Sequence, residues 1–252
     1  MPILKKVVGF LDDYLKIDDI EDSSWNGLQF EGVSKVEKIA FAVDASVESF
    51  EMAAKKNADM LIVHHGHFWS NHDPSIKGWT KDRLNVLYEN NLSLYACHLP
   101  LDRHKEVGNN AQILKILGAR VKKEFLIHKG KNIGWIGESK KTISLKDIER
   151  KLVASLETEC IILPFGKDEV KSIAVCSGGG SYGGFYEALA QNADVYITGD
   201  TAEIYYTAKD SEMNVIFAGH HTTETIGLKA LSRVLEKKLK VQVLFIDLPT
   251  GL

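Results

Sequence analysis

The chain of 252 residues has few cysteines and no long apolar run, so it lacks the features of disulfide-rich secreted proteins and of membrane proteins. Three irregularly spaced cysteines argue against a disulfide framework and favour a reducing compartment. No apolar run approaches the roughly 20 residues of a membrane-spanning helix. Residues 3–16 have the apolar spacing of an amphipathic helix and lack the pattern of an export signal. We therefore expect a cytoplasmic protein without a membrane partner. The cysteines are Cys97, Cys160 and Cys176.

The chain also lacks a strong charge of either sign. It carries 31 basic and 34 acidic residues, a formal net charge of −3. No global electrostatic footprint therefore points to nucleic acid, although a local basic patch would leave that partner open. A small-molecule substrate, including a nucleotide, is compatible with this balance.

Strand and helix patterns alternate along the chain, which is typical of an α/β fold. Residues 22–29, which include Asn26-Gly27, are rich in turn signals. We predict helices near residues 3–16, 47–56, 81–90, 109–117, 145–156, 185–192 and from about 224 to 238. We predict strands near residues 39–43, 58–65, 92–97, 125–127, 133–137, 161–163, 173–177, 195–197, 215–218 and 241–246.

The two halves of the chain resemble each other. The triplet Asn-Ala-Asp at 57–59 recurs at 192–194, and Phe50 and Phe185 are separated by the same offset. That offset also sets His64-His65 against Gly199-Asp200. Further on, a second and shorter offset relates His98 to His220 and Asp102 to Glu224. The ordered matches predict a duplicated α/β unit with pseudo-twofold symmetry.

We place the first lobe at residues 1–124 and the second at 125–252, with a C-terminal strand that can return to the first lobe. Duplication would bring equivalent strand tips together, so we expect a metal site at the interface of the lobes. The polar side chains at those tips are His64, His65, His98, Asp102, Asp200, His220 and Glu224.

The centre of the pattern is the apolar run from Asn57 that ends in His64-His65-Gly66. Strand tips are where α/β proteins place their chemistry. Adjacent residues on a strand point to opposite faces, so the two imidazoles share one site only if the chain turns there, or else they serve different ions. Gly66 permits such a turn. The simpler alternative is a pair of polar loop histidines.

Imidazole nitrogens with carboxylate oxygens form the ligand set of Zn, Fe(II) and Mn. Carboxylates can also bridge two ions. The spacing of His220 and Glu224 puts both on one face of a helix. The same spacing holds for His98 and Asp102, although Pro100 favours a turn there. The alternative is that the acidic residues are helix caps.

Four ordered segments resemble the Nif-three-like dinuclear metal-centre family, whose members are often labelled GTP cyclohydrolase type 2 homologues. They are Ala58 to Gly66, Cys97-His98 to Asp102, Thr198-Gly199-Asp200, and Ala218-Gly219-His220 to Glu224. Residues 25–29, Trp-Asn-Gly-Leu-Gln, are similar to that family's N-terminal signature, with Trp25-Asn26 in place of the usual residues.

The resemblance implies two divalent ions (Zn, Fe or Mn) and a homohexameric ring. It implies that His98 orients Asp102 or a bound water, and that Glu224 bridges. His221 stands where the family often has Tyr, which adds a possible acid/base or ligand group. The implied metal ligands are His64, His65, Asp102, His220 and Glu224.

The function we predict is a dinuclear metal-dependent hydrolase with GTP as a candidate substrate, and we assign no catalytic residue. The alternative is a non-enzymatic ring for metal handling or for binding nucleic acid or protein. The glycine-rich stretch 178–184 formally fits a dinucleotide fingerprint, but the first half has no such glycines. A nucleotide-cofactor enzyme is therefore disfavoured, and an anion cradle at these glycines stays open.

Overall fold

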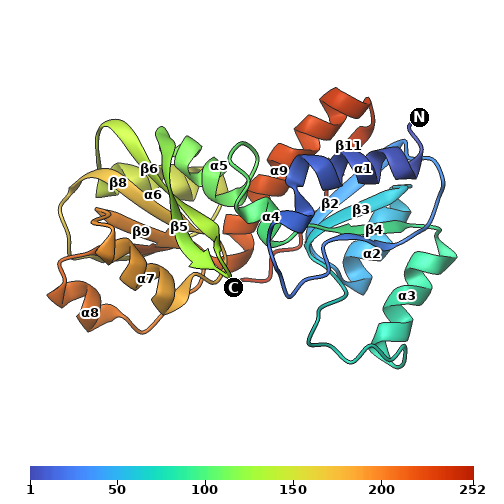
Figure 1. The fold of residues 1–252 in the computed structure, drawn as a ribbon, viewed down its shortest axis with the longest axis horizontal. Helices are drawn as coiled ribbons and strands as arrows, with labels where there is room; N and C mark the ends of the chain where they lie inside the picture. The colour runs from blue at the N-terminus through green and yellow to red at the C-terminus, as the bar shows by residue number, and fades with distance from the viewer. The chain divides into compact units, whose positions relative to one another are not determined.

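The computed structural model describes residues 1–252, apart from the side chain of Ser181, and confirms the α/β fold (Figure 1). By contacts the chain divides into two compact units. The first comprises Met1–Leu101 and Leu228–Leu248, and the second Asp102–Gly227 and Pro249–Leu252. The predicted division at residues 124 and 125 follows the sequence repeat and stays a prediction.

The first unit is built on a sheet of strand order β1-β4-β3-β2-β11. Strands β4, β3, β2 and β11 are parallel, and β1 pairs with β4 in the antiparallel direction. The elements are α1 (Leu4–Leu15), the 3₁₀ turn η1 (Ile17–Asp19), β1 (Gly27–Phe30), β2 (Lys38–Asp44), α2 (Val47–Lys55), β3 (Met60–His65), α3 (Trp79–Glu89), β4 (Ser93–Ala96) and β11 (Gln242–Phe245).

The second unit has a sheet of strand order β5-β6-β8-β9-β10-β7, in which β8, β9 and β10 are parallel. Its elements are α5 (Asn109–Ile116), β5 (Ala119–His128), β6 (Lys131–Ser144), α6 (Leu145–Leu156), β7 (Ile161–Pro164), β8 (Glu169–Cys176), α7 (Ser181–Ala190), β9 (Val195–Thr198), α8 (Tyr205–Asp210) and β10 (Asn214–Phe217). Two helices contain a unit boundary, α4 (Leu99–Asp102) and α9 (His220–Leu239).

Helices cover both faces of the second sheet. On one face α5 and α6 share a hydrophobic core with Ile173 and Val175 of β8, and on the other α7 and α8 pack with Ala174 and Cys176. Alternate residues of one strand thus enter different cores. Strands covered on both faces need continuous apolar sequence, which is why the central strands of both sheets were recognisable.

The first unit follows the same rule. Phe50 and Ala53 of α2 and Leu87 of α3 pack with apolar residues of β2, β3 and β4. Helix α1 buries Leu4, Val7, Leu11 and Leu15. Of the apolar positions on which this helix was predicted, Val7 and Leu11 are buried, whereas Ile3 is exposed. Ser46 caps α2, since its hydroxyl accepts a hydrogen bond from the Ser49 N–H.

Strand pairing supports the duplication. Val63 of β3 and Thr198 of β9 are related by the first offset, and each lies between two parallel neighbours. They pair with Ala96 and Phe217, which are therefore equivalent positions. His98 is the second residue after Ala96, whereas His220 is the third after Phe217. The second unit thus has one extra residue before its histidine, where Gly219 has a φ of +82°.

Three local predictions were wrong. Residues 27–30, predicted as part of a turn, form β1, because β4 supplies a pairing partner. Strands β5 and β6 extend well beyond the predicted short segments, because they pair with each other along their length. Helix α8 was not predicted, since its one short stretch is too brief to show a helical period.

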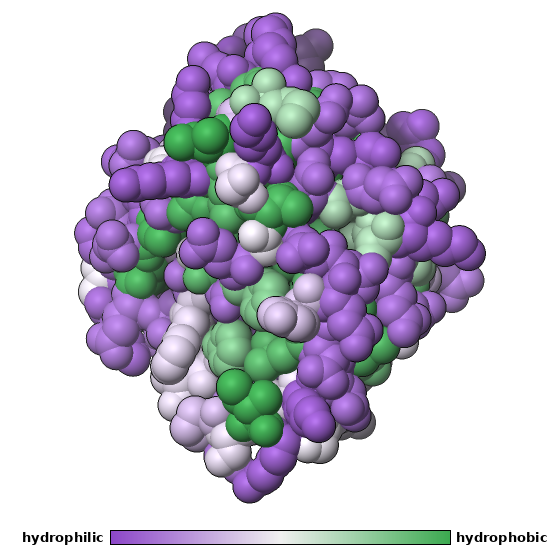
Figure 2. All heavy atoms as spheres, turned by 90° about the vertical axis from the view of Figure 1, so that its right-hand side faces the viewer, coloured by the Kyte–Doolittle hydropathy of each residue, from purple (hydrophilic) through white to green (hydrophobic). Residues whose placement is uncertain are grey.

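One face of the molecule is mostly polar. Figure 2 shows the face at the right-hand side of Figure 1, where hydrophilic side chains surround broken hydrophobic patches. No helix among the described residues is both long and apolar enough to cross a membrane. The three cysteines carry no disulfide. The predicted cytoplasmic location stays a prediction.

Candidate metal-binding site

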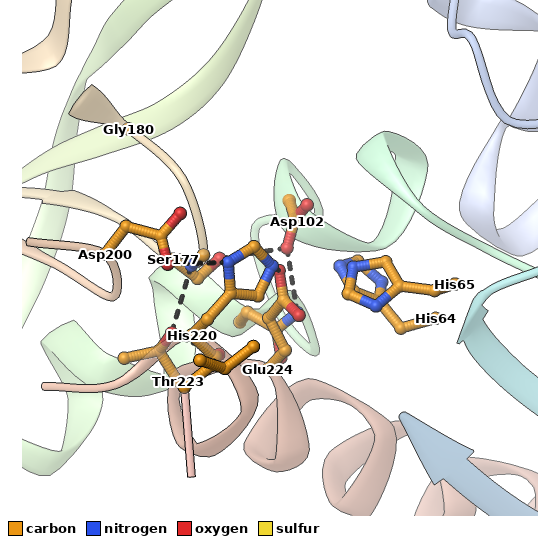
Figure 3. A network of polar contacts seen from close by, with 12 residues as sticks. His64, His65, Asp102, Ser177, Gly180, Asp200, His220, Thr223 and Glu224 are labelled. Atoms are coloured by element: carbon orange, nitrogen blue, oxygen red, sulfur yellow. Dashed lines mark hydrogen bonds and ion pairs between the residues drawn. The ribbon is translucent and has the colours of Figure 1, made fainter. Parts of the chain in front are cut away.

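In the first unit three imidazoles gather at the tips of neighbouring strands. His64 and His65 end β3, and His98 follows β4. Each offers one ligand atom, and these atoms lie within 4.8 Å of one another. The ring centroids of His64 and His65 are 4.8 Å apart, so the adjacent residues do meet at one place although both belong to β3 (Figure 3).

Each of the three rings has its Nδ1 atom against an oxygen acceptor. A carbonyl or carboxylate oxygen can only accept, so Nδ1 donates, and the neutral ring keeps its lone pair on Nε2. This arrangement orients metal-binding histidines in many proteins. The Nδ1 to oxygen distances are 2.8 Å from His64 to the Cys97 carbonyl, 2.8 Å from His65 to Asp44, and 3.0 Å from His98 to Asp22.

Asp22 organises the segment around His98. Its carboxylate also accepts hydrogen bonds from the Ser24 and Leu99 N–H groups. Burial alone would raise the pKa of Asp22, but the hydrogen bonds from His98, Asn26 and Ser24 outweigh it and lower the pKa to about 2. Asp22 therefore stays ionised, and the Asn26 side chain accepts from the His98 N–H.

Gln29 fastens the loop that follows the histidine pair. Its Oε1 accepts from the His67 N–H at 2.7 Å and from the Phe68 N–H at 3.2 Å. Its Nε2 donates to the Trp25 carbonyl at 2.7 Å. A Cβ atom at Gly66 would lie 2.4 Å from this amide, so only glycine fits there. The signature-like segment 25–29 thus holds the strand tips of the first unit.

In the second unit Asp102 is buried, with 5% of its surface exposed. Its Oδ1 accepts from the Asn109 side chain at 2.8 Å and from the Ser177 hydroxyl at 2.9 Å. Asn110 donates to the Asp102 main-chain carbonyl and accepts from the Ser177 N–H. Asn109 and Ser177 therefore fix this carboxylate, whereas the Nδ1 atom of His98 faces Asp22 and not Asp102.

His220 and Glu224 form a second cluster of polar side chains in the second unit, apart from Asp102 and its partners (Figure 3). Helix α9 begins at His220, earlier than the predicted start near residue 224, so His220 and Glu224 lie one turn apart at its N-terminal end. Nε2 of His220 is 3.3 Å from Oε1 of Glu224, and Nδ1 is 2.8 Å from Asp200. The hydrogen bond from His220 to the buried Glu224 is the main cause that raises the pKa of His220 to about 9, and Asp200 adds to it.

Gly178 completes this group. Its φ is +58°, and a Cβ atom there would lie 2.2 Å from Oε1 of Glu224 and 3.1 Å from Nε2 of His220. The missing side chain leaves room at the atoms that can bind a cation. This space and the imidazole and carboxylate donors fit a divalent ion with nitrogen and oxygen ligands.

Other parts of the glycine-rich stretch are already hydrogen-bonded. The Gly178 N–H donates to Thr223, and the Gly180 N–H to Thr198. The carbonyl of Gly178 accepts from the main-chain N–H groups of Gly199 and Asp200. The Gly178 N–H therefore ties the end of β8 to α9, and the Gly180 N–H ties it to β9, which leaves neither group available to an anion.

His221 is buried and lines a cavity of about 710 Å³ in the second unit. Its N–H donates to the Leu252 carbonyl at 3.3 Å. The lining residues also include three acidic residues, three threonines and an aromatic residue: Glu157, Glu159, Asp200, Thr158, Thr201, Thr222 and Phe217. The cavity therefore lies beside the carboxylate that holds His220.

The sequence pointed to every histidine of these groups and to Asp102, Asp200 and Glu224. It did not point to the residues that hold them, namely Asp22, Asp44, Asn109, Asn110 and Ser177. Most of these residues contact partners that are distant in the chain, and no regular spacing relates them to those partners. Their roles therefore become visible only in the folded structure.

The chain is an α/β protein with clustered histidine and acidic side chains that could hold a metal ion. The family model described as Duf34/NIF3 (NGG1p interacting factor 3) matches residues 2–250, and the chain belongs to this family.

Named relatives agree with this membership. A Pyrococcus horikoshii protein called "GTP cyclohydrolase 1 type 2 homolog" is 47% identical over 249 residues and covers 98% of each chain. One of the same name from Archaeoglobus fulgidus is 44% identical over 250 residues, 99% of each chain.

Solved structures agree as well. "Protein ybgI, unknown function" has a TM-score of 0.91 at 33% identity and covers 100% of each chain. A protein from Thermus thermophilus has a TM-score of 0.87 at 36% identity, again with 100% of each chain covered. The family resemblance predicted from the sequence is therefore confirmed.

Proposed function

We propose that this protein binds two divalent metal ions and uses them to hydrolyse a small-molecule substrate. The ligands we propose are those predicted from the sequence: His64, His65, Asp102, His220 and Glu224. The observation that carries the proposal is the set of oxygen acceptors at Nδ1 of His64, His65 and His220. Rings held in this way present Nε2 as a ligand, and the donor set suits Zn, Fe or Mn.

A pair of bound divalent ions lowers the pKa of a coordinated water and stabilises charge on the oxygens of the substrate. The residues of the chain supply the frame for that chemistry. Asp44 and Asp200 accept from His65 and His220, which increases the basicity of each ring. Glu224 has two carboxylate oxygens in a buried position, so it suits a bridging role.

The name of the relatives makes GTP a candidate substrate. The cavity beside Asp200 supports a small-molecule substrate, because it offers hydroxyl groups and the Phe217 ring next to the His220 group. Substrate binding there would use His221 as a donor or acceptor that reaches the cavity wall.

The first test is metal content together with activity. Metal-loaded wild type is expected to hold two ions per chain by elemental analysis and to hydrolyse GTP or a generic phosphoester. His64→Ala and Glu224→Ala are expected to lose at least one ion and about 100-fold in rate. His72→Ala and Glu236→Ala change exposed residues of the same types and serve as matched controls. Equal metal content and rates in all five proteins would refute the proposal.

The non-enzymatic alternative predicts two ions without turnover of any substrate tested. It is linked to the predicted hexameric ring, which would have a mass of about six times 28.1 kDa. Light scattering on metal-free and metal-loaded protein tests that assembly. A monomeric mass under both conditions would exclude the hexameric ring.

A further inference from the structure

A basic concavity in the second unit lies outside the proposed metal ligands. It has a volume of about 470 Å³. Its lining comes from the end of α5, the start of β5, the β6 segment and α6. The lining residues are Leu117, Gly118, Arg120, Ser139, Lys140, Lys141, Thr142, Ile143 and Lys151.

Four of these nine residues are cationic and none is acidic. The concentration is notable because the whole chain has a net charge of −3. Nearby acids form ion pairs with other partners: Glu138 with Lys122, and Asp147 with Arg150. Among the described residues, the four cations of the concavity take part in no ion pair. Asp147 attracts Lys151, and Glu138 lies opposite Arg120 in the β5–β6 pairing, so these acids offset part of the repulsion among the four cations and a bound anion would offset more.

Local backbone features create this grouping. The pairing of β6 with β8 shifts register between Glu138 and Ile143, so residues 139–142 leave that ladder as a bulge. The buried Ser139 hydroxyl donates to the Lys141 carbonyl and anchors the bulge. Lys140 and Lys141 are therefore displayed on a fixed loop within an otherwise regular strand.

The opposite wall is fixed as well. Gly118, with a φ of +76°, ends α5 and lets the chain turn into β5 toward Arg120. The Lys151 ammonium donates to the Leu117 carbonyl at 3.4 Å, which ties α6 to this turn. Two of the three ammonium donors of Lys151 remain for another acceptor.

We propose that this concavity binds a ligand that carries two or more phosphate groups. A guanidinium offers a planar fork of donors to phosphate oxygens, and ammonium groups add point charges around it. Four cations exceed what a single carboxylate needs and match the charge of an oligophosphate. The site is independent of the metal centre, because none of its residues belongs to the metal-binding groups.

The test is titration calorimetry of metal-free protein at about 0.15 M salt, where surface charges are screened as in the cell. The ligands are tripolyphosphate, orthophosphate and a single-stranded oligonucleotide. Tripolyphosphate is expected to bind at least ten times more tightly than orthophosphate. The double variant Lys140→Gln/Lys141→Gln is expected to bind it about tenfold more weakly. Lys237→Gln/Lys238→Gln removes an exposed lysine pair at the end of α9 and is the matched control, expected to stay within twofold of wild type.

The oligonucleotide distinguishes the source of the phosphates. Tighter binding of the oligonucleotide than of tripolyphosphate, lost in the Lys140/Lys141 variant alone, would identify a nucleic acid backbone as the ligand. Absent binding of both by wild type, or equal losses in the two lysine variants, would overturn the proposal. Circular dichroism of both variants tests whether misfolding causes the lost binding. If the Lys140/Lys141 variant does not fold, Arg120→Gln removes another cation of the concavity and is expected to weaken tripolyphosphate binding.

Discussion

The two units use the same scaffold but place different chemistry at equivalent strand tips. The β3 tip carries His64-His65, and the equivalent β9 tip carries Gly199-Asp200. A Cβ atom at Gly199 would lie 2.8 Å from the Gly178 carbonyl oxygen, so the position of the first imidazole is filled by main chain in the second unit. The second unit places its imidazole on the first turn of α9. Because His220 is the counterpart of His98, both units keep the strands and this histidine, whereas only the first unit carries the His64-His65 pair.

The edge strands differ in the same way. Strand β1 has a register shift between Leu28 and Phe30 opposite β4, whereas β7 pairs with β10 without a shift. Gln29 is the additional residue of that bulge. The first unit has therefore gained a side chain that fastens the loop after its histidines, and the second unit has no counterpart in β7.

We expect the largest effect on the second unit from Gly178→Ala, because the added Cβ would collide with Glu224 and His220. We expect metal affinity to fall by about 100-fold, with a loss of about 1–2 kcal/mol of stability from the positive φ. Gly130→Ala is the control, since Gly130 has a φ of +82° with no atom within 4 Å of its Cβ. Calorimetric metal titration and thermal unfolding measure both. Similar metal affinity in the two variants would contradict the role of Gly178.

Asp22→Asn removes the negative charge that holds His98 and nearly keeps the shape of the side chain. We expect divalent metal affinity to fall by about 10-fold or more, as for other residues that orient a ligand. The absorption spectrum of bound Co²⁺ is expected to change if His98 is a ligand. Asp13→Asn, at an exposed position of α1, is the control. An unchanged affinity and spectrum would show that His98 has no part in metal binding.

The ion pair between His220 and Glu224 in the second unit makes the free energy of unfolding depend on pH. The pKa of His220 is raised from 6.5 to about 9 in the metal-free protein. Its ion pair with Glu224 therefore stabilises the fold fully below pH 6.5, and this contribution is lost as the pH rises through about 9.

We expect the difference in unfolding free energy between wild type and His220→Gln to be about 1–2 kcal/mol at pH 6 and to vanish above pH 9. Urea denaturation of metal-free protein at several pH values measures it. Parallel curves for the two proteins across this range would mean that His220 carries no such charge.

The smallest effect concerns the bulge residue. Gln29→Ala removes the hydrogen bonds from its amide to main-chain groups around the loop, and we expect a loss of about 1–2 kcal/mol. Hydrogen exchange at the His67 and Phe68 amides is expected to accelerate, while amides of the second unit keep their rates. Unchanged exchange at these two amides would show that the loop does not depend on Gln29.

Sequence patterns predicted most of the central strands and helices, because apolar periodicity reports burial. They also predicted the histidine and acidic groups and the repeat that relates the units. They missed β1, since Asn26-Gly27 is a strong turn signal and the pairing strand β4 lies in a distant part of the chain. They missed the function of Asp22 and Ser177 for the same reason. Hydrogen bonds between distant residues leave no period in the sequence.

The assignment of His98 illustrates this limit. The family resemblance implied that His98 orients Asp102 or a bound water. In the structure, Nδ1 of His98 donates a hydrogen bond to Asp22. The Asp102 carboxylate accepts hydrogen bonds from Asn109 and Ser177. The sequence pointed to these polar residues but not to the hydrogen-bond partner of each.

The pairing of β11 with β2 has a consequence for biosynthesis. Strand β2 is an interior strand only when Gln242–Phe245 lies beside it, and these residues are translated after every strand of the second sheet. Until then Ile39 to Val43 form an open edge of apolar residues, the kind of surface on which nascent chains aggregate. The sheet of the first unit is thus begun before the second sheet and finished after it, which makes chaperone dependence and the yield of C-terminally truncated chains sensitive reporters of this one strand.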